Sequence, residues 1–118
     1  MKKNYIIHMA GGDPDPQKSG DTRSWFFYYK WDVDGEVFFP LPIPNPLEGI
    51  QKGDRLWFAM DEVLIGHVDV LHVSTDEINN KLEIAYDGSK CFRYARALKA
   101  PGQTGLLPEE VSELWLEK

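Results

Sequence analysis

The residues whose types could carry chemistry begin with a dense aromatic run. Between residues 23 and 31 the chain has six aromatic side chains and two cations. Stacking of a nucleobase needs ring faces with cations nearby, and this segment supplies both. The candidate stacking surface consists of Arg23, Trp25, Tyr28, Lys30 and Trp31. Large aromatic residues also dominate the cores of small β domains, so the alternative is that the run is simply core.

A second group of basic and aromatic residues lies between Gly88 and Pro108, in a stretch without acidic residues. Cations interleaved with aromatic rings suit a nucleic-acid strand. The alternative is a solvated edge strand, whose charges prevent pairing with other sheets. The residues of this group are Lys90, Cys91, Phe92, Arg93, Tyr94, Arg96 and Lys99.

His67, Asp69 and His72 form a third group within one expected strand. Alternation puts His67 and Asp69 on one face and His72 on the other. An Asp–His pair can orient an imidazole for acid–base chemistry, and the alternative is a surface or hydrogen-bonded histidine. With Cys91 as the single thiol, the spacing gives no zinc site. No phosphate-binding loop, dinucleotide fingerprint or nucleophile elbow is present, and we expect neither a metal nor a cofactor.

The composition indicates a single domain spanning residues 1–118. The net charge of −6 weighs against a protein that coats nucleic acid nonspecifically, because such binding depends on cations at phosphates. A single cysteine excludes an internal disulfide framework and favours a reducing, cytoplasmic compartment. The sequence shows neither the apolar core of a signal peptide nor a segment that could span a bilayer, so we expect no membrane association.

The elements that must position these residues are mostly strands. Aromatic and β-branched residues, separated by Gly, Pro, Asn and Asp, predict them. The expected strands span residues 4–9, 23–31, 36–39, 55–60, 63–75, 81–86 and 91–97. Asp34-Gly35 predicts a hairpin between the second and third strands. Prolines at every second position, Pro40, Pro42, Pro44 and Pro46, predict an extended segment outside the sheet. Pro108 suits the first position of a short C-terminal helix.

The stretch from residue 48 to residue 73 carries a family resemblance. A Gly-Asp turn begins one apolar strand, and the next strand has Gly66 in its middle, where a bulge or sharp bend is expected. In Lys52-Gly53-Asp54-Arg55 and Ile65-Gly66-His67 the chain resembles PUA-like small β-barrels, the group that includes ASCH and EVE domains. The resemblance implies a compact barrel with a cleft at one end, which in many members binds RNA or reads a modified base. Some ASCH members are hydrolases or nucleases, but no catalytic set of theirs can be placed on this sequence.

We therefore predict a mainly β (α+β) fold, a PUA-like closed or partly open β-barrel with a short C-terminal helix. The predicted function is that of a non-catalytic, cytoplasmic binding module that recognises a nucleotide, RNA or a modified base in a cleft lined by aromatic residues. Aromatic rings would stack the base while Arg23, Lys30 or Arg55 contacts phosphate. The predicted ligand-binding residues are Arg23, Trp25, Tyr28, Lys30, Trp31, Arg55, Trp57, Arg93 and Arg96.

Two alternatives stay open. A small acidic chain could be a phage or mobile-element interaction or inhibitor protein that sequesters a nucleotide or mimics nucleic acid, and it would then have a protein partner. The other alternative is a small ASCH-like hydrolase that uses Asp69, His67 or Glu62. Binding of oligonucleotides, binding of a basic protein and turnover of a substrate distinguish the three hypotheses.

Overall fold

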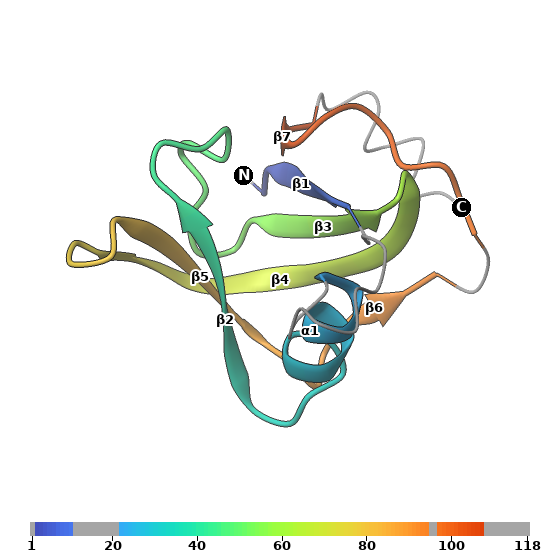
Figure 1. Cartoon of the computed structure of the whole chain (residues 1–118), viewed down its shortest axis with the longest axis horizontal. Coiled ribbons are helices and arrows are strands. Elements are labelled where there is room, and N and C mark those ends of the chain that lie inside the picture. Colours follow the sequence, from blue (N-terminus) through green and yellow to red (C-terminus); the bar gives the residue numbers. More distant parts are fainter. Residues whose placement is uncertain (1, 11–21, 95–96, 108–118) are drawn as a thin grey trace, which may run out of the picture.

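The structure, a computed structural model, describes residues 2–10, 22–94 and 97–107. The strands are β1 (Asn4–Met9), β2 (Glu36–Pro42), β3 (Arg55–Met60), β4 (Val63–Asp76), β5 (Lys81–Asp87), β6 (Phe92–Arg93) and β7 (Gly105–Leu106), and the helix is α1 (Thr22–Tyr29) (Figure 1). The C-terminal helix expected from Pro108 lies outside the described residues. None of the helical structure within these ranges has the length and apolarity of a membrane-crossing helix.

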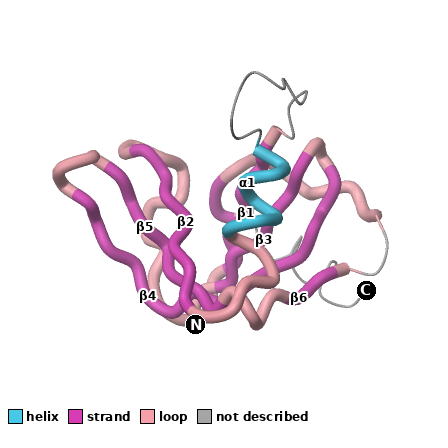
Figure 2. The backbone as a smooth tube through the Cα atoms, turned by 60° about the horizontal axis from the view of Figure 1, so that its bottom comes forward, coloured by secondary structure: helices cyan, strands magenta, loops and turns pink. Residues whose placement is uncertain are grey.

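The seven strands form one continuous sheet. Its hydrogen-bonded order is β2-β5-β4-β3-β1-β7, with β6 added beside β4. β1 and β3 run parallel, and the other pairs are antiparallel. β4 is the strand that both halves share, because its first half pairs with β3 and its second half with β5. In Figure 2 the β2–β5 end of the sheet rises on one side and the β1–β3 end on the other.

Two β-bulges interrupt β4. Ile65 is an extra residue where the register with β3 shifts, and Leu71 is an extra residue where the register with β5 shifts. A bulge bends its strand and increases the local twist. The irregularity that the sequence predicts beside Gly66 is therefore confirmed.

The mainly β prediction is confirmed, but the predicted barrel is wrong because the sheet does not close. The path of paired strands runs from β2 to β7, and within the described residues these two strands do not pair with each other. β7 has only two residues. In β2, Pro40 and Pro42 have no N–H to donate to a further strand. Neither end of the sheet offers a long ladder that could close it.

The proline-containing segment and the strand expected at residues 91–97 also differ from prediction. Pro40 and Pro42 lie within the sheet, in β2, and pair with β5. An edge strand tolerates proline because one of its sides has no partner. Of the last expected strand, residues 95–96 lie outside the described part of the chain, and among the others Phe92 and Arg93 form β6.

The segment expected as a strand at residues 23–31 forms helix α1 instead, so the predicted hairpin at Asp34-Gly35 is wrong as well. Phe26 is fully buried, and its ring centroid lies 4.9 Å from that of Phe58. The Lys30 amide donates a hydrogen bond to the Phe26 carbonyl at the end of the helix. Residues 25–29 are all aromatic, so the run has apolar residues both at the alternate positions of a strand and along one side of a helix. The sequence pattern therefore cannot distinguish a strand from a helix with one buried side.

The main core includes residues of α1 and of the sheet. Leu56, Phe58 and Met60, which alternate along β3, belong to this core together with Phe26. Trp57 and Ala59, which lie between them, belong to a smaller cluster. Successive side chains of a strand point to opposite faces, so this smaller cluster marks the outer face of the sheet. The candidate site lies on this outer face.

Candidate functional site

The outer face of the sheet carries four rings from neighbouring strands. Trp57 on β3 is paired with His67 on β4, and His67 is paired with Phe92 on β6. Residues paired across strands share a face. Tyr94 follows β6, and its ring stacks against that of Trp57. We call Trp57, His67, Phe92 and Tyr94 the aromatic face.

The four rings are in continuous contact. The rings of His67 and Phe92 are almost parallel, with an interplanar angle of 9° and centroids 4.7 Å apart. Trp57 lies 4.7 Å from His67 and 5.9 Å from Tyr94. Trp57 is only 1% exposed, and its Nε1 donates to Asn4 Oδ1 at 3.0 Å. Phe92 is 54% exposed. Trp57 is therefore the buried floor of the aromatic face, and Phe92 is the ring that a ligand can reach.

Gly66 allows β6 to lie against β4. A Cβ atom at this position would lie 1.8 Å from the carbonyl oxygen of Phe92 and 3.0 Å from the Trp31 ring. Real Cβ atoms do not approach backbone this closely, so any other residue would displace β6. Gly66 thus positions the exposed ring of the aromatic face.

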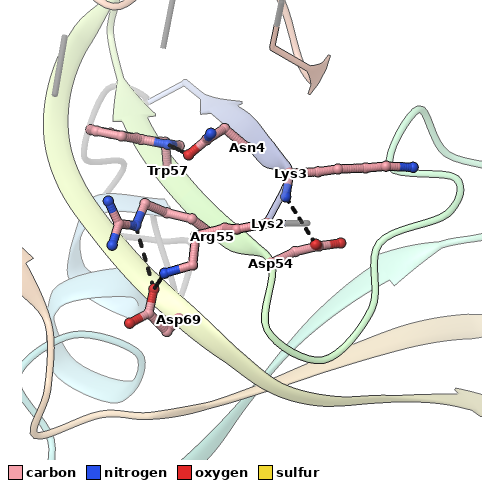
Figure 3. A network of polar contacts seen from close by, with 7 residues as sticks. All are labelled: Lys2, Lys3, Asn4, Asp54, Arg55, Trp57 and Asp69. Carbon is pink, nitrogen blue, oxygen red and sulfur yellow. Dashed lines mark hydrogen bonds and ion pairs between the residues drawn. The ribbon is translucent and has the colours of Figure 1, made fainter. Parts of the chain in front are cut away.

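Charged side chains lie beside the rings. Arg55, half-buried on β3, places Nε 3.4 Å from Asp69 Oδ1. The Lys2 ammonium lies 3.5 Å from the same oxygen. Figure 3 shows both cations reaching Asp69, with Trp57 and Asn4 beside them. This cluster has two cations for one carboxylate, so the border of the aromatic face is locally positive in a chain whose net charge is −6.

His67 is neutral at physiological pH. Burial, followed by the positive charge of Arg55, lowers the pKa of His67 to about 4, and Asp69 acts in the opposite direction. Burial also raises the pKa of Tyr94. The aromatic face therefore presents uncharged rings beside the charges of Arg55, Lys2 and Asp69.

The acid–base group considered from sequence does not assemble. In the described part of the chain Asp69 pairs with Arg55 and Lys2 and makes no hydrogen bond with His67. His72 lies beyond the second bulge and pairs with Glu36 at 2.7 Å. Residues 2–10, 22–94 and 97–107 contain no group of three or more potential metal-binding side chains.

The predicted ligand-binding residues fall into separate places. Arg55 and Trp57 share the outer face, and Arg93 lies next to Phe92 on β6, where its guanidinium pairs with Asp32 at 2.6 Å. Arg96 lies outside the described residues. The structure therefore places Phe92 and Tyr94, from the predicted group of interleaved basic and aromatic residues, on the same face as Arg55 and Trp57 of β3.

The first predicted group is divided between core and surface. Trp31 is 2% exposed and packs in the core. Trp25 is half-buried, with the Lys30 ammonium 5.4 Å from its ring centroid, and burial lowers the pKa of Lys30. Tyr28 is 75% exposed on α1. Arg23 pairs with Asp61 at 2.7 Å. Trp31 therefore belongs to the core, whereas Tyr28 and the Arg23–Asp61 pair lie at the surface.

Five residues at this site are not among the predicted ligand-binding residues: Phe92, Tyr94, His67, Asn4 and Lys2. Phe92 and Tyr94 belong to the predicted group of interleaved basic and aromatic residues, and His67 to the predicted acid–base group. The alternation of side chains along a strand is the signal that could have identified some of them. Phe92 and Tyr94 are two residues apart, as are Arg55 and Trp57, so each pair is expected on one face of its strand. The pairing of Phe92 with His67 is long-range and has no local signature.

A cleft of about 690 Å³ lies elsewhere on the molecule. Its walls come from the end of β1, from the Asp61-Glu62 turn and from the segment between Lys99 and Thr104. Among the residues that the structure describes, its lining includes none of the predicted ligand-binding residues and no Phe, Tyr or Trp. The aromatic residues predicted to line a cleft therefore lie outside this one.

Comparisons of the chain with protein-family models, with curated proteins and with solved structures find no match.

Proposed function

We propose that this protein is a non-catalytic, cytoplasmic binding module that stacks a nucleobase on Phe92. The base would belong to a nucleotide or to a single-stranded or modified nucleic acid. The observation that carries the proposal is the exposed Phe92 ring, which lies parallel to His67 at 4.7 Å with Arg55 bordering the same face. Stacking on an aromatic ring with cations nearby is the usual way in which proteins bind single-stranded bases.

The surrounding residues hold this ring in a fixed position. Phe92 is paired with His67 through β6, and Trp57 supports His67 from below. A ring fixed before binding loses little conformational freedom when a base stacks on it. The low pKa of His67 keeps its imidazole uncharged, so the Phe92–His67 stack does not carry a buried charge at neutral pH.

Arg55 and Lys2 are the groups that would contact phosphate. A guanidinium has five N–H donors, and within the described residues the bond from Nε to Asp69 is the only one that the Arg55 guanidinium makes. Two cations give a modest salt dependence: for single strands, the slope of log K against log salt is expected to be about −1.4. Such a slope suits an acidic protein that binds locally instead of coating nucleic acid.

The resemblance to PUA-like domains supports the same proposal. We propose that the Gly53-Asp54 turn and Gly66 have the roles that the resemblance implies, namely to start β3 and to bend the sheet. The sheet is open and is not a closed barrel. The proposed relationship to PUA-like domains therefore rests on these two motifs and on the residues that they position.

Titration of tryptophan fluorescence tests the function. The ligands are free nucleotides, single-stranded RNA and DNA, and duplexes with modified bases. Saturable quenching is expected for one class. Phe92→Ala should weaken binding about 5- to 150-fold, since stacking contributes about 1–3 kcal/mol per base. Arg55→Met should weaken binding and reduce the salt slope by about 0.7.

Matched controls separate the site from the rest of the surface. Phe27→Ala removes another exposed aromatic ring, and Arg23→Met removes another arginine that pairs with an aspartate. Both should bind like the wild type. If no ligand quenches, or if Phe27→Ala weakens binding as much as Phe92→Ala, base stacking on the aromatic face is ruled out.

A protein-binding function is the second candidate, and exposed rings on α1 favour it. Phe27, Tyr28 and Tyr29 are 41%, 75% and 56% exposed, which is unusual for three consecutive large residues. This hypothesis expects silence in the nucleotide titration and loss of a protein complex on Tyr28→Ala.

A further inference from the structure

The cleft at the end of β1 is a second candidate site, independent of the aromatic face. Its volume of about 690 Å³ lies within the range of small-molecule sites. In Figure 1 the orange segment that leads to β7 passes the turn between β3 and β4. This segment, the turn and the end of β1 form the walls.

Hydrogen bonds tie the three walls together. The Asp61 amide donates to the Met9 carbonyl at 3.0 Å, and the Ala100 amide donates to the Glu62 carbonyl at 2.8 Å. The His8 amide donates to Thr104 Oγ1 at 2.8 Å. The cleft is thus fixed by bonds between segments that are far apart in sequence, as expected of a preformed binding site.

The lining includes one anion and one cation that are not paired. Glu62 and Lys99 both line the cleft, and neither forms an ion pair within the described ranges. They lie on adjacent segments, since Val63 bridges to Lys99 and the Ala100 amide binds the Glu62 carbonyl. The other carboxylate of the lining, Asp61, is neutralised by Arg23 at 2.7 Å. The lining therefore offers one open negative and one open positive charge.

The neutral polar groups add a donor and an acceptor. His8 Nε2 lies 3.1 Å from the carbonyl oxygen of Pro101. A carbonyl oxygen only accepts, so Nε2 carries the proton in the neutral ring and Nδ1 is left as an acceptor. Thr104 Oγ1 accepts from the His8 amide, so its own hydrogen can be donated to a ligand. Met9, Ala10 and Ala100 supply apolar surface in the same cleft.

From this lining we propose that the cleft binds a small zwitterion, a free α-amino acid with an aliphatic side chain. Its ammonium group binds Glu62, its carboxylate binds Lys99 and the Thr104 hydroxyl, and its side chain contacts the apolar part of the lining. A ligand with one charge would satisfy only one of the two open groups, whereas a zwitterion satisfies both.

Amide NMR spectra of the whole chain test the proposal with glycine, L-alanine and L-leucine as probes. Acetate and methylammonium are the single-charge controls. Titration to about 10 mM reaches ten times a Kd of 1 mM. We expect saturable shifts at the amides of Gly102, Gln103 and Thr104, strongest for L-leucine or L-alanine, and weaker or no shifts for the two controls.

Charge-removing variants complete the test. Glu62→Gln and Lys99→Met should each weaken binding about tenfold or more, as expected for the loss of a charged hydrogen bond. The matched variants Glu77→Gln and Lys81→Met remove exposed charges away from the cleft and should bind like the wild type. The dispersion of the same spectra shows that each variant is folded. Absence of shifts at all three amides, equal shifts with acetate or methylammonium, or full binding by both cleft variants would overturn the proposal.

Discussion

Removing the carboxylate of Asp54 should destabilise the fold more than removing any exposed charge. Asp54 is 2% exposed. Its Oδ1 accepts from the Lys3 amide at 3.1 Å, and its Oδ2 accepts from the Gln51 amide at 3.0 Å. Figure 3 shows Asp54 facing the start of β1. The side chain therefore ties β1 to the turn that begins β3.

The magnitude follows from the two amides. In Asp54→Ala both N–H groups lose their acceptor, and a buried donor without a partner costs about 1–3 kcal/mol. Lys3 and Gln51 have exposed side chains, so water can partly replace the carboxylate, and we expect a loss of about 2–4 kcal/mol in the free energy of unfolding. Asp54→Asn keeps one acceptor oxygen and should lose about 1–2 kcal/mol.

Urea unfolding monitored by tryptophan fluorescence measures these losses. Asp69→Ala is the matched control, because its carboxylate is itself exposed and, within the described residues, pairs with the exposed Lys2 and the half-buried Arg55, and it should cost less than about 1 kcal/mol. The m-value should stay constant, since the exposed surface changes little. If Asp54→Ala unfolds within about 0.5 kcal/mol of Asp69→Ala, the two amides do not depend on the carboxylate and the reasoning is refuted.

Three further predictions concern the aromatic face. Gly66→Ala places a Cβ 1.8 Å from the Phe92 carbonyl oxygen, so it should cost about 3 kcal/mol or more in urea unfolding and weaken base binding, whereas wild-type stability would contradict the close approach. His67 has a folded pKa of about 4 against 6.5 when unfolded. As the pH falls, His67 therefore takes up its proton first in the unfolded state. The contribution of neutral His67 to the free energy of unfolding is complete above pH 6.5 and is lost as the pH falls to about 4. Screening of the half-exposed ring limits this contribution to about 1–2 kcal/mol. His67→Phe keeps the ring and should flatten unfolding free energy against pH in that window, and an unchanged profile would exclude His67 as the source. Arg93→Met breaks an exposed pair with Asp32 and should change stability by less than about 0.5 kcal/mol, so a larger loss would mean that the pair holds β6.

The sequence predicts the centre of the sheet well because its signals there are local. β3 spans the expected residues, and β4 and β5 differ by one residue from prediction. The apolar residues of these strands alternate with polar ones, or follow a Gly-Asp turn. In α1 those signals are absent: five consecutive aromatic residues give no alternation, and packing of Phe26 on Phe58 decides the conformation. That contact joins residues far apart in sequence, so no local pattern can reveal it.

Whether the sheet closes, and which residues meet at the site, also depend on contacts between residues that are far apart in sequence. A barrel requires the first and last strands to pair, which depends on strand lengths that the sequence leaves open. Arg55 and Trp57 could be placed on one face from alternation alone. Which residues of β4 and β6 lie beside them depends on register, and register is set by the turn and by bulges.

The bulge at Ile65 decides the register and therefore the site. Up to Leu64, which pairs with Ala59, β4 follows the two-residue turn in regular antiparallel register. Continued without a bulge, that register would place Gly66 opposite Trp57 and turn His67 toward the core. The extra residue shifts the pairing by one, so that Trp57 faces His67. The same shift puts Gly66 where only glycine lets β6 approach. A single inserted residue thus turns His67 to the outer face, allows β6 to pair beside it and creates the aromatic face.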